Sequence, residues 1–168
     1  RIAIANEPPW TQVTSDGKVS GAGPDVALAV LKKLGVGDIV ASISEYGAMI
    51  PGLQAQRFDM VAAGLFIKPE RCEAVAFSQP DLCDAESFMV KEGNPMGLKS
   101  FADIAKFKDQ LNGKIFGIEP GNDGNLLIDG MIKSNQFGLG EFKMVESSEA
   151  GMLEAIRMAQ SLAQTRHH

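Results

Sequence analysis

The feature that most constrains the fold is an alternation, along the whole chain, of short apolar runs with longer segments of helical periodicity. The short runs have the length and composition of buried strands, and the longer segments repeat apolar residues every three or four positions. This order is typical of an α/β protein with small, mostly parallel sheets covered by helices. The predicted strands are Arg1–Ala5, Asp38–Ile43, Asp59–Ala63, Val75–Phe77, Ala85–Lys91, Lys114–Ile118 and Phe142–Glu146, and the predicted helices are Pro24–Gly35, Ala48–Gln56, Pro69–Ala74, Phe101–Leu111, Asn122–Gln136 and Glu149–Ala163.

A turn-rich stretch, Glu92-Gly93-Asn94-Pro95, interrupts the alternation before it starts again. Such stretches mark domain boundaries, because few contacts cross them. We therefore predict a first lobe over residues 1–92, a linker or hinge over 93–100 and a second lobe over 101–165. The terminal Arg166-His167-His168 we interpret as a cloning remnant.

Charge and composition exclude several classes of partner. The 168 residues carry 16 basic and 21 acidic side chains, a net charge of −5, with no basic run. Nucleic acid and anionic membranes are therefore poor partners. No apolar run approaches the roughly 20 residues of a membrane span, so we expect no membrane insertion. The chain begins directly at a strand, with no signal segment, which fits a cytoplasmic protein or a trimmed mature one.

The two cysteines, Cys72 and Cys83, are too few for a disulfide framework and lack metal-ligand spacing. Whether the two form a disulfide with each other is left undecided by the sequence, because that depends on the distance and orientation of the two side chains. No metal site and no cofactor are expected.

The first candidate site follows the first strand. Two prolines stiffen the loop between Glu7 and Trp10. Trp10, Tyr46 and Phe66 all come in loops after strands, and three rings beside a carboxylate could enclose an organic cation. The alternative is that these aromatic residues serve ordinary packing.

The second candidate is Arg71, which comes after a strand that ends in Ala62-Ala63-Gly64. The ends of strands in α/β sheets hold small ligands, and a guanidinium matches the geometry of a carboxylate. The alternative is an exposed helical arginine paired with Glu70 or Glu73. Since no nucleophile–base pair accompanies the arginine, the sequence predicts capture of a carboxylated molecule and no catalytic residue.

In the second half, Lys114–Ile118 leads into a glycine-containing turn and the start of a helix at Asn122. This arrangement directs backbone N–H groups at whatever lies above the strand. It is neither a Walker loop nor a dinucleotide fingerprint. Helix capping by Asn122 or Asp123 is at least as good an interpretation, and Ser148 is a candidate cap for the last helix.

Residues 1 to about 100 resemble the first lobe of a type II periplasmic solute-binding protein, of the ectoine/hydroxyectoine branch of the polar amino-acid group. The resemblance rests on ANEPPW at 5–10, DGKVSGAGPDVA at 16–27, EYGAMIPGLQAQRFDMVAAG at 45–64 and IKPERCEAVAFSQP at 67–80. It implies that acidic and aromatic residues surround the cationic ring of a ligand while an arginine holds its carboxylate. The ligand contacts implied in this half are Glu7, Trp10, Tyr46, Gly64, Phe66 and Arg71. The resemblance also implies a periplasmic receptor that delivers its ligand to an ABC permease.

From about Leu98 the chain is similar to a different branch, the choline- and glycine-betaine-binding receptors, through LKSFADIAKFKDQLNGKIFGIEPGNDGNLLIDGMI and FKMVESSEAGMLEAI. That similarity implies a ligand contact at Asn122. We therefore expect a chimera of two receptors rather than an unusual natural protein. Such receptors are normally longer, because their chain returns to complete the first lobe. Without the return segment we expect weakened binding and a homodimer or swapped assembly.

The predicted function is therefore a non-enzymatic receptor for a cationic or zwitterionic compatible solute: ectoine, glycine betaine or choline. The alternatives are a polar amino-acid receptor, a truncated or recombined scaffold without activity, and a binding-protein-fold enzyme such as a dehydratase. Against the enzyme, Glu7 is the only obvious acid of the site, and no internal histidine or lysine is placed to pair with it.

Overall fold

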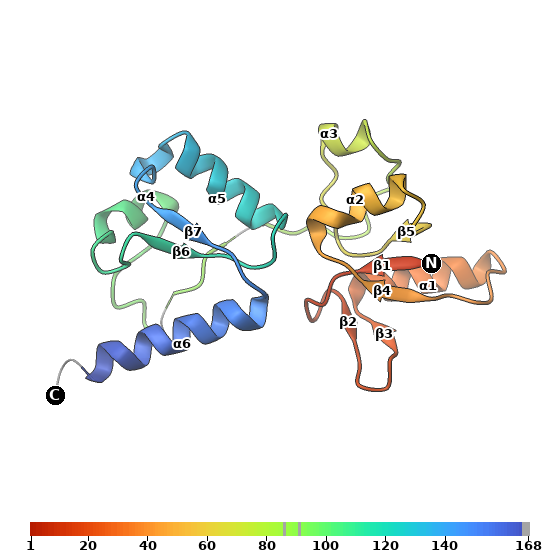
Figure 1. Cartoon of the computed structure of the whole chain (residues 1–168), viewed down its shortest axis with the longest axis horizontal. Coiled ribbons are helices and arrows are strands. Elements are labelled where there is room, and N and C mark those ends of the chain that lie inside the picture. Colours follow the sequence, from red (N-terminus) through yellow and green to blue (C-terminus); the bar gives the residue numbers. More distant parts are fainter. Residues whose placement is uncertain (86, 91, 166–168) are drawn as a thin grey trace. The chain divides into compact units, whose positions relative to one another are not determined.

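The computed structural model describes residues 1–85, 87–90 and 92–165, with the side chains of 159–165 left out of the description. The chain divides into two compact units, Arg1–Asp84 and the residues from Ala85 onward, which are coloured red to yellow and green to blue in Figure 1. The division comes before the linker at 93–100, whose role as a hinge stays a prediction.

The first unit is built on a parallel sheet of three strands in the order β4-β1-β5. The central strand β1 (Ile2–Ile4) pairs with β4 (Ala41–Ile43) on one side and with β5 (Met60–Val61) on the other. All three strands lie within segments predicted as strands. Their shared direction brings their carboxyl ends to one edge of the sheet.

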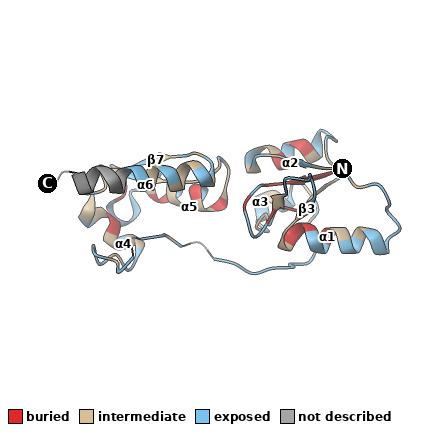
Figure 2. Cartoon of the chain, turned by 90° about the horizontal axis from the view of Figure 1, so that it is seen from below, coloured by how far each residue is buried: buried red, intermediate tan, exposed pale blue. Residues whose placement is uncertain are grey.

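Helices α1 (Ala22–Lys33) and α2 (Tyr46–Gln54) cover the two faces of this sheet (Figures 1 and 2). Ile2 and Ile4 belong to a core cluster with Ala27 of α1, whereas Ala5 clusters with Met49 of α2. Successive side chains of a strand point to opposite faces. The central strand is therefore buried on both sides, which explains why its sequence is a continuous apolar run.

An antiparallel hairpin, β2 (Gln12–Val13) with β3 (Val19–Ser20), and the short helix α3 (Pro69–Cys72) complete the first unit. The hairpin was not predicted. The hairpin packs on the side of the sheet that α1 covers. Its Val13 and Val19 lie against the core cluster that contains Ile2 and Ile4.

The second unit has a two-stranded parallel sheet of β6 (Lys114–Phe116) and β7 (Lys143–Val145). Its buried core consists of Ile104, Met131, Leu139 and Phe142. Around it lie α4 (Phe101–Ile104), η1 (Ala105–Phe107), α5 (Asp123–Lys133), η2 (Gln136–Gly138) and α6 (Glu149–Thr165). The prediction of helix-covered, mostly parallel sheets is confirmed in both units.

Two strand predictions are wrong. Val75–Phe77 forms no strand, and neither do the described residues of Ala85–Lys91, from which Glu86 and Lys91 are excluded. A strand needs a neighbour for its backbone N–H and C=O groups. Among the described residues no strand pairs with the outer side of β5, so these β-prone segments remain irregular.

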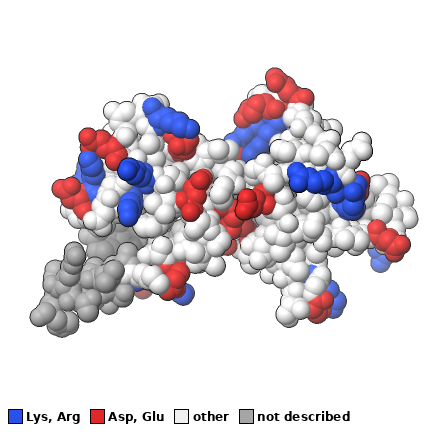
Figure 3. All heavy atoms as spheres, viewed as in Figure 1, with Lys and Arg blue, Asp and Glu red and all other residues white. Residues whose placement is uncertain are grey.

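On the face shown in Figure 3, the basic and acidic side chains of the described residues are interspersed. In the part of the chain that the structure describes, no helix combines the length and the apolar composition that a membrane span requires.

Candidate functional site

Glu7 and Tyr46 meet at the carboxyl edge of the first sheet. Glu7 follows β1 and its side chain is buried, with 8% of the residue exposed. Its Oε2 accepts a hydrogen bond of 2.7 Å from the hydroxyl of Tyr46, the first residue of α2. The same hydroxyl lies 3.0 Å from the carbonyl oxygen of Ala63, which follows β5. One side chain thus links the ends of two strands and fixes a buried carboxylate between them.

The loop after β1 carries both Glu7 and Trp10, three residues apart. The carbonyl oxygen of Glu7 accepts hydrogen bonds from the backbone N–H of Trp10 at 2.9 Å and of Thr11 at 3.0 Å. Thr11 is fully buried, and its Oγ1 accepts from the backbone N–H of Glu7 at 3.3 Å. Trp10, in contrast, is 40% exposed. The loop is therefore tightly bonded within itself while its ring remains accessible.

Phe66 and Arg71 are joined in the segment after β5. Arg71 lies on α3, and its Nη1 donates to the carbonyl oxygen of Phe66 at 2.9 Å. Both residues are half-buried. Gly64 is exposed with a φ of +67°, and a Cβ built there would have no heavy atom within 4 Å. The guanidinium is thus oriented by the loop that carries the Phe66 ring, and Gly64 leaves open space at the end of the strand.

The first unit contributes every predicted ligand contact except Asn122. Hydrogen bonds join Glu7 with Tyr46 and Phe66 with Arg71. That all these residues surround one ligand stays a prediction, as does the convergence of the three rings.

Asn122 belongs to the second unit and caps α5. Its Oδ1 accepts from the backbone N–H of Gly124 at 2.8 Å, which is the capping role considered above. Ser148 caps α6 in a similar way, because its Oγ accepts from the N–H of Gly151 at 3.1 Å.

The sequence analysis missed Asn125, a buried polar residue near the strand ends of the second unit. Its Nδ2 donates to the carbonyl oxygens of Ile118 and Glu119 and to Oε1 of Glu146, at 3.0 to 3.2 Å. Its Oδ1 accepts from the N–H of Ile118 at 3.1 Å. Asn125 therefore holds the turn after β6 against the residue after β7. Gly117 leaves room for this side chain, because a Cβ there would lie 2.3 Å from Asn125 Oδ1.

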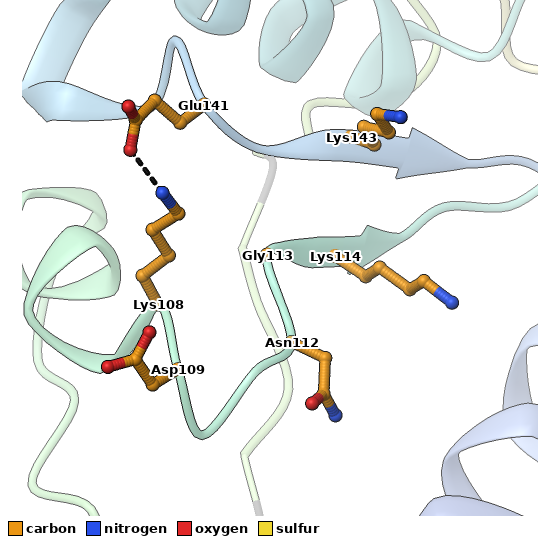
Figure 4. Close-up of a pocket in the computed structure, with 7 residues that line it drawn as sticks. All are labelled: Lys108, Asp109, Asn112, Gly113, Lys114, Glu141 and Lys143. Carbon is orange, nitrogen blue, oxygen red and sulfur yellow. Dashed lines mark hydrogen bonds and ion pairs between the residues drawn. The ribbon is translucent and has the colours of Figure 1, made fainter.

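Two hollows, one in each unit, lie away from these residues. A depression of about 450 Å³ in the second unit (Figure 4) is lined by Lys108, Asp109, Asn112, Gly113, Lys114, Glu141 and Lys143. An ion pair joins Lys108 with Glu141, and this lysine lowers the pKa of the glutamate. In the first unit, a depression of about 340 Å³ includes Arg1 and Asp59. Both lie at the amino ends of strands, opposite the edge that carries Glu7 or Asn122.

The described residues contain no group of three or more His, Cys, Asp or Glu side chains that could hold a metal ion. Cys72 and Cys83 are both free and exposed.

Comparison with known proteins places the chain in a family. The family model of the bacterial extracellular solute-binding proteins, family 3, matches residues 1–163. The protein y4tE of Sinorhizobium fredii (strain NBRC 101917 / NGR234), named a probable amino-acid ABC transporter periplasmic-binding protein, is 47% identical over 107 residues, which are 62% of this chain and 36% of that protein.

Two solved structures confirm the predicted fold class. EhuB, solved in complex with hydroxyectoine, is 53% identical with a TM-score of 0.73, over 93% of this chain and 58% of EhuB. The ancestral amino acid-binding protein AncCDT-1, a precursor of cyclohexadienyl dehydratase, is 25% identical with a TM-score of 0.76, over 95% of this chain and 65% of that protein. The chain therefore spans less than two thirds of the length of each of these three relatives. The origin of its halves in two receptor branches stays a prediction. Because the family model spans nearly the whole sequence, the chain belongs to the bacterial extracellular solute-binding proteins, family 3.

Proposed function

We propose that the chain captures a small cationic or zwitterionic solute, in the manner of a receptor that serves an ABC transporter. The observation that carries the proposal is the buried carboxylate of Glu7, oriented by Tyr46, in a short loop whose Trp10 is 40% exposed. A carboxylate in a low-dielectric site attracts a cation more strongly than one in water. An aromatic face beside it adds cation–π attraction.

The solute class that fits best is a compatible solute with a cationic centre and a carboxylate, of which ectoine and glycine betaine are examples. Glu7 and Trp10 would take the cationic centre, and Arg71 would take the carboxylate through two parallel hydrogen bonds. The 53% identity with EhuB, solved with hydroxyectoine, favours the ectoine type. Choline, which has no carboxylate, would use only the part of the site that binds the cationic centre, Glu7 and Trp10.

A polar amino acid is the second candidate ligand. It is favoured by the name of y4tE, a probable amino-acid transporter component, and by the description of AncCDT-1 as amino acid-binding. By analogy with such relatives, the chain acts in the periplasm, delivers its solute to a permease and catalyses no reaction.

Isothermal titration with ectoine, glycine betaine, choline, arginine and glutamine tests the proposal. We expect heat of binding with ectoine, and Glu7→Gln should weaken it by about 2 kcal/mol, roughly 30-fold in Kd. Asp38→Asn is the matched control, because it removes one negative charge from an exposed residue before β4, at the opposite edge of the sheet. Binding of only the amino acids would favour the second candidate. Equal effects of both variants would show that Glu7 acts through net charge alone, and turnover of a titrated solute would contradict the non-enzymatic proposal.

A further inference from the structure

We infer that the start of α1, formed by Ala22 and Gly23 with Gly21 as the N-cap, positions the loop that carries Glu7 and Trp10, so that Gly21 and Ala22 are positioning residues for ligand capture. The part of this inference that concerns affinity rests on the proposed function. The part that concerns the placement of Trp10 does not.

Gly21 allows a backbone contact that no other residue permits. A Cβ built on Gly21 would lie 2.5 Å from the carbonyl oxygen of Trp10 and 2.9 Å from Cα of Thr11. Its φ of +119° and ψ of 168° fall in a region that is essentially restricted to glycine. An added methyl group would therefore have to displace either the Trp10 loop or the start of α1.

Hydrogen bonds cross the same contact. The backbone N–H of Ala22 donates to the carbonyl oxygen of Pro9 at 3.4 Å, and that of Gly23 donates to the carbonyl oxygen of Trp10 at 3.3 Å. The first N–H groups of a helix have no partner within the helix and are normally met by a capping side chain. Gly21 is the N-cap and has no side chain to offer. The carbonyl oxygens of Pro9 and Trp10 therefore cap α1 in place of a side chain. The same hydrogen bonds fix the position of the loop.

The start of α1 also affects the position of Glu7 and contacts the segment after β5. Within the loop, Thr11 accepts from the N–H of Glu7, so a displacement at Trp10 is passed on to the residue that carries the carboxylate. On its other side, Gly23 is buried, and a Cβ there would lie 3.5 Å from the carbonyl oxygen of Ala62, just before Gly64. The start of α1 therefore lies against both the Glu7–Trp10 loop and the end of the β5 segment.

The simpler interpretation is that Gly21 only allows the chain to turn. Gly17 offers a control for this, since it also has a positive φ, of +80°, but a Cβ there would have no heavy atom within 4 Å. Gly17→Ala adds backbone strain without contact. Gly21→Ala adds strain together with displacement of Trp10.

The test uses Trp10, the only tryptophan of the chain, as the reporter. Iodide quenching and the emission maximum of its fluorescence are measured for the wild type, Gly21→Ala and Gly17→Ala, followed by titration with ectoine. We expect Gly21→Ala to change the quenching constant about twofold and to raise Kd about tenfold, since binding groups must be held within about 0.5 Å. Gly17→Ala should match the wild type in both. Wild-type quenching and affinity in Gly21→Ala, or equal changes in both variants, would overturn the inference.

A second variant covers the case in which Gly21→Ala does not fold. Ala22→Pro removes the N–H that bonds to Pro9, at the first helical position, where proline is tolerated. It should raise the quenching of Trp10 while the helical circular dichroism stays at the wild-type level. Unchanged quenching would overturn the inference. If the wild type binds no ectoine, the proposed function fails for that solute, and the fluorescence measurements still decide the positioning role.

Discussion

Arg71 donates from Nη1 to the carbonyl oxygen of Phe66, and this bond orients its guanidinium on the loop after β5. Lysine could reproduce the charge at this position but neither the planar fork nor its geometry toward a carboxylate. The identity of residue 71 should therefore matter for solutes that carry a carboxylate and much less for solutes that lack one.

We predict that Arg71→Lys weakens the binding of ectoine and glycine betaine by about 1.5 kcal/mol, roughly tenfold in Kd, the range of a charge-assisted hydrogen bond. The affinity for choline should stay within about twofold of the wild type. Titration of the three solutes against Arg71→Lys measures both effects. Arg57→Lys, at an exposed arginine of the same unit, is the matched control. Equal losses for glycine betaine and choline would show that Arg71 serves the fold instead.

The sequence indicated where the site residues lie along the chain but not which of them touch. Glu7 and Tyr46 could each be placed at the end of a strand, because strand ends follow from the pattern of apolar runs. Their hydrogen bond joins residues 39 positions apart and depends on the order β4-β1-β5, which no local pattern encodes. Asn125 was missed for the same reason, since its role depends on the pairing of β6 with β7.

Among the secondary-structure elements, the long helices and the strands of both parallel sheets were predicted, whereas the hairpin was missed and two predicted strands do not form. α1 and α5 lie within or close to their predicted segments, because their apolar spacing is local information. The hairpin of β2 and β3 has only two residues in each strand, although Asp16-Gly17 between them is a turn signal. Val75–Phe77 has strand composition and no strand, because composition cannot supply a neighbouring backbone.

The start of α4 offers a pH-dependent contribution to stability. Oδ2 of Asp103 accepts from the backbone N–H of Ser100 at 3.0 Å and of Lys99 at 3.1 Å, and Oδ1 accepts from Nζ of Lys106 at 2.6 Å. The ammonium of Lys106 first, and then the backbone N–H of Lys99, lower the pKa of Asp103 from 3.8 to about 2. In the unfolded chain the carboxyl group takes up its proton at higher pH than in the folded chain. The stabilisation is therefore fully present above about pH 4 and is lost as the pH falls toward 2.

We predict that Asp103→Asn lowers the free energy of unfolding at pH 6 and that its difference from the wild type shrinks as the pH falls through the window between 3.8 and about 2. Urea unfolding at a series of pH values measures this difference. Asp109→Asn makes the same charge change at an exposed residue nearby, and should show a much smaller pH dependence. A difference between Asp103→Asn and wild type that stays constant down to pH 2 would contradict the prediction.

At the scale of the whole molecule, the predicted ligand contacts are unevenly divided. Glu7, Trp10, Tyr46, Phe66 and Arg71 all belong to the unit Arg1–Asp84, and Asn122 alone belongs to the other. Affinity should therefore depend mainly on how well the first unit is folded. The stability of that unit is consequently as important for function as the contacts themselves.

The first unit also exposes apolar surface. Val26, Val30 and Leu34, spaced four residues apart along and just beyond α1, are 46%, 48% and 74% exposed. β4 and β5 are the outer strands of their sheet, and Ile43 at the end of β4 is 58% exposed. An aligned row of exposed apolar side chains and the edge strands of a sheet both favour association with a second copy of the chain.

We therefore predict that the chain forms a homodimer or a swapped assembly at micromolar concentration, as measured by light scattering coupled to size exclusion. Val30→Glu should shift the population toward monomer, because it places a charge in the middle of the apolar row. Ala29→Glu adds the same charge at an exposed neighbouring position of α1, turned by about 100° around the helix axis, and should leave the assembly unchanged. If Ala29→Glu dissociates the assembly as strongly as Val30→Glu, net charge and not the apolar row controls association. A wild-type chain that stays monomeric up to its solubility limit would show that these residues need no partner, and ligand titration could then be interpreted with one site per chain.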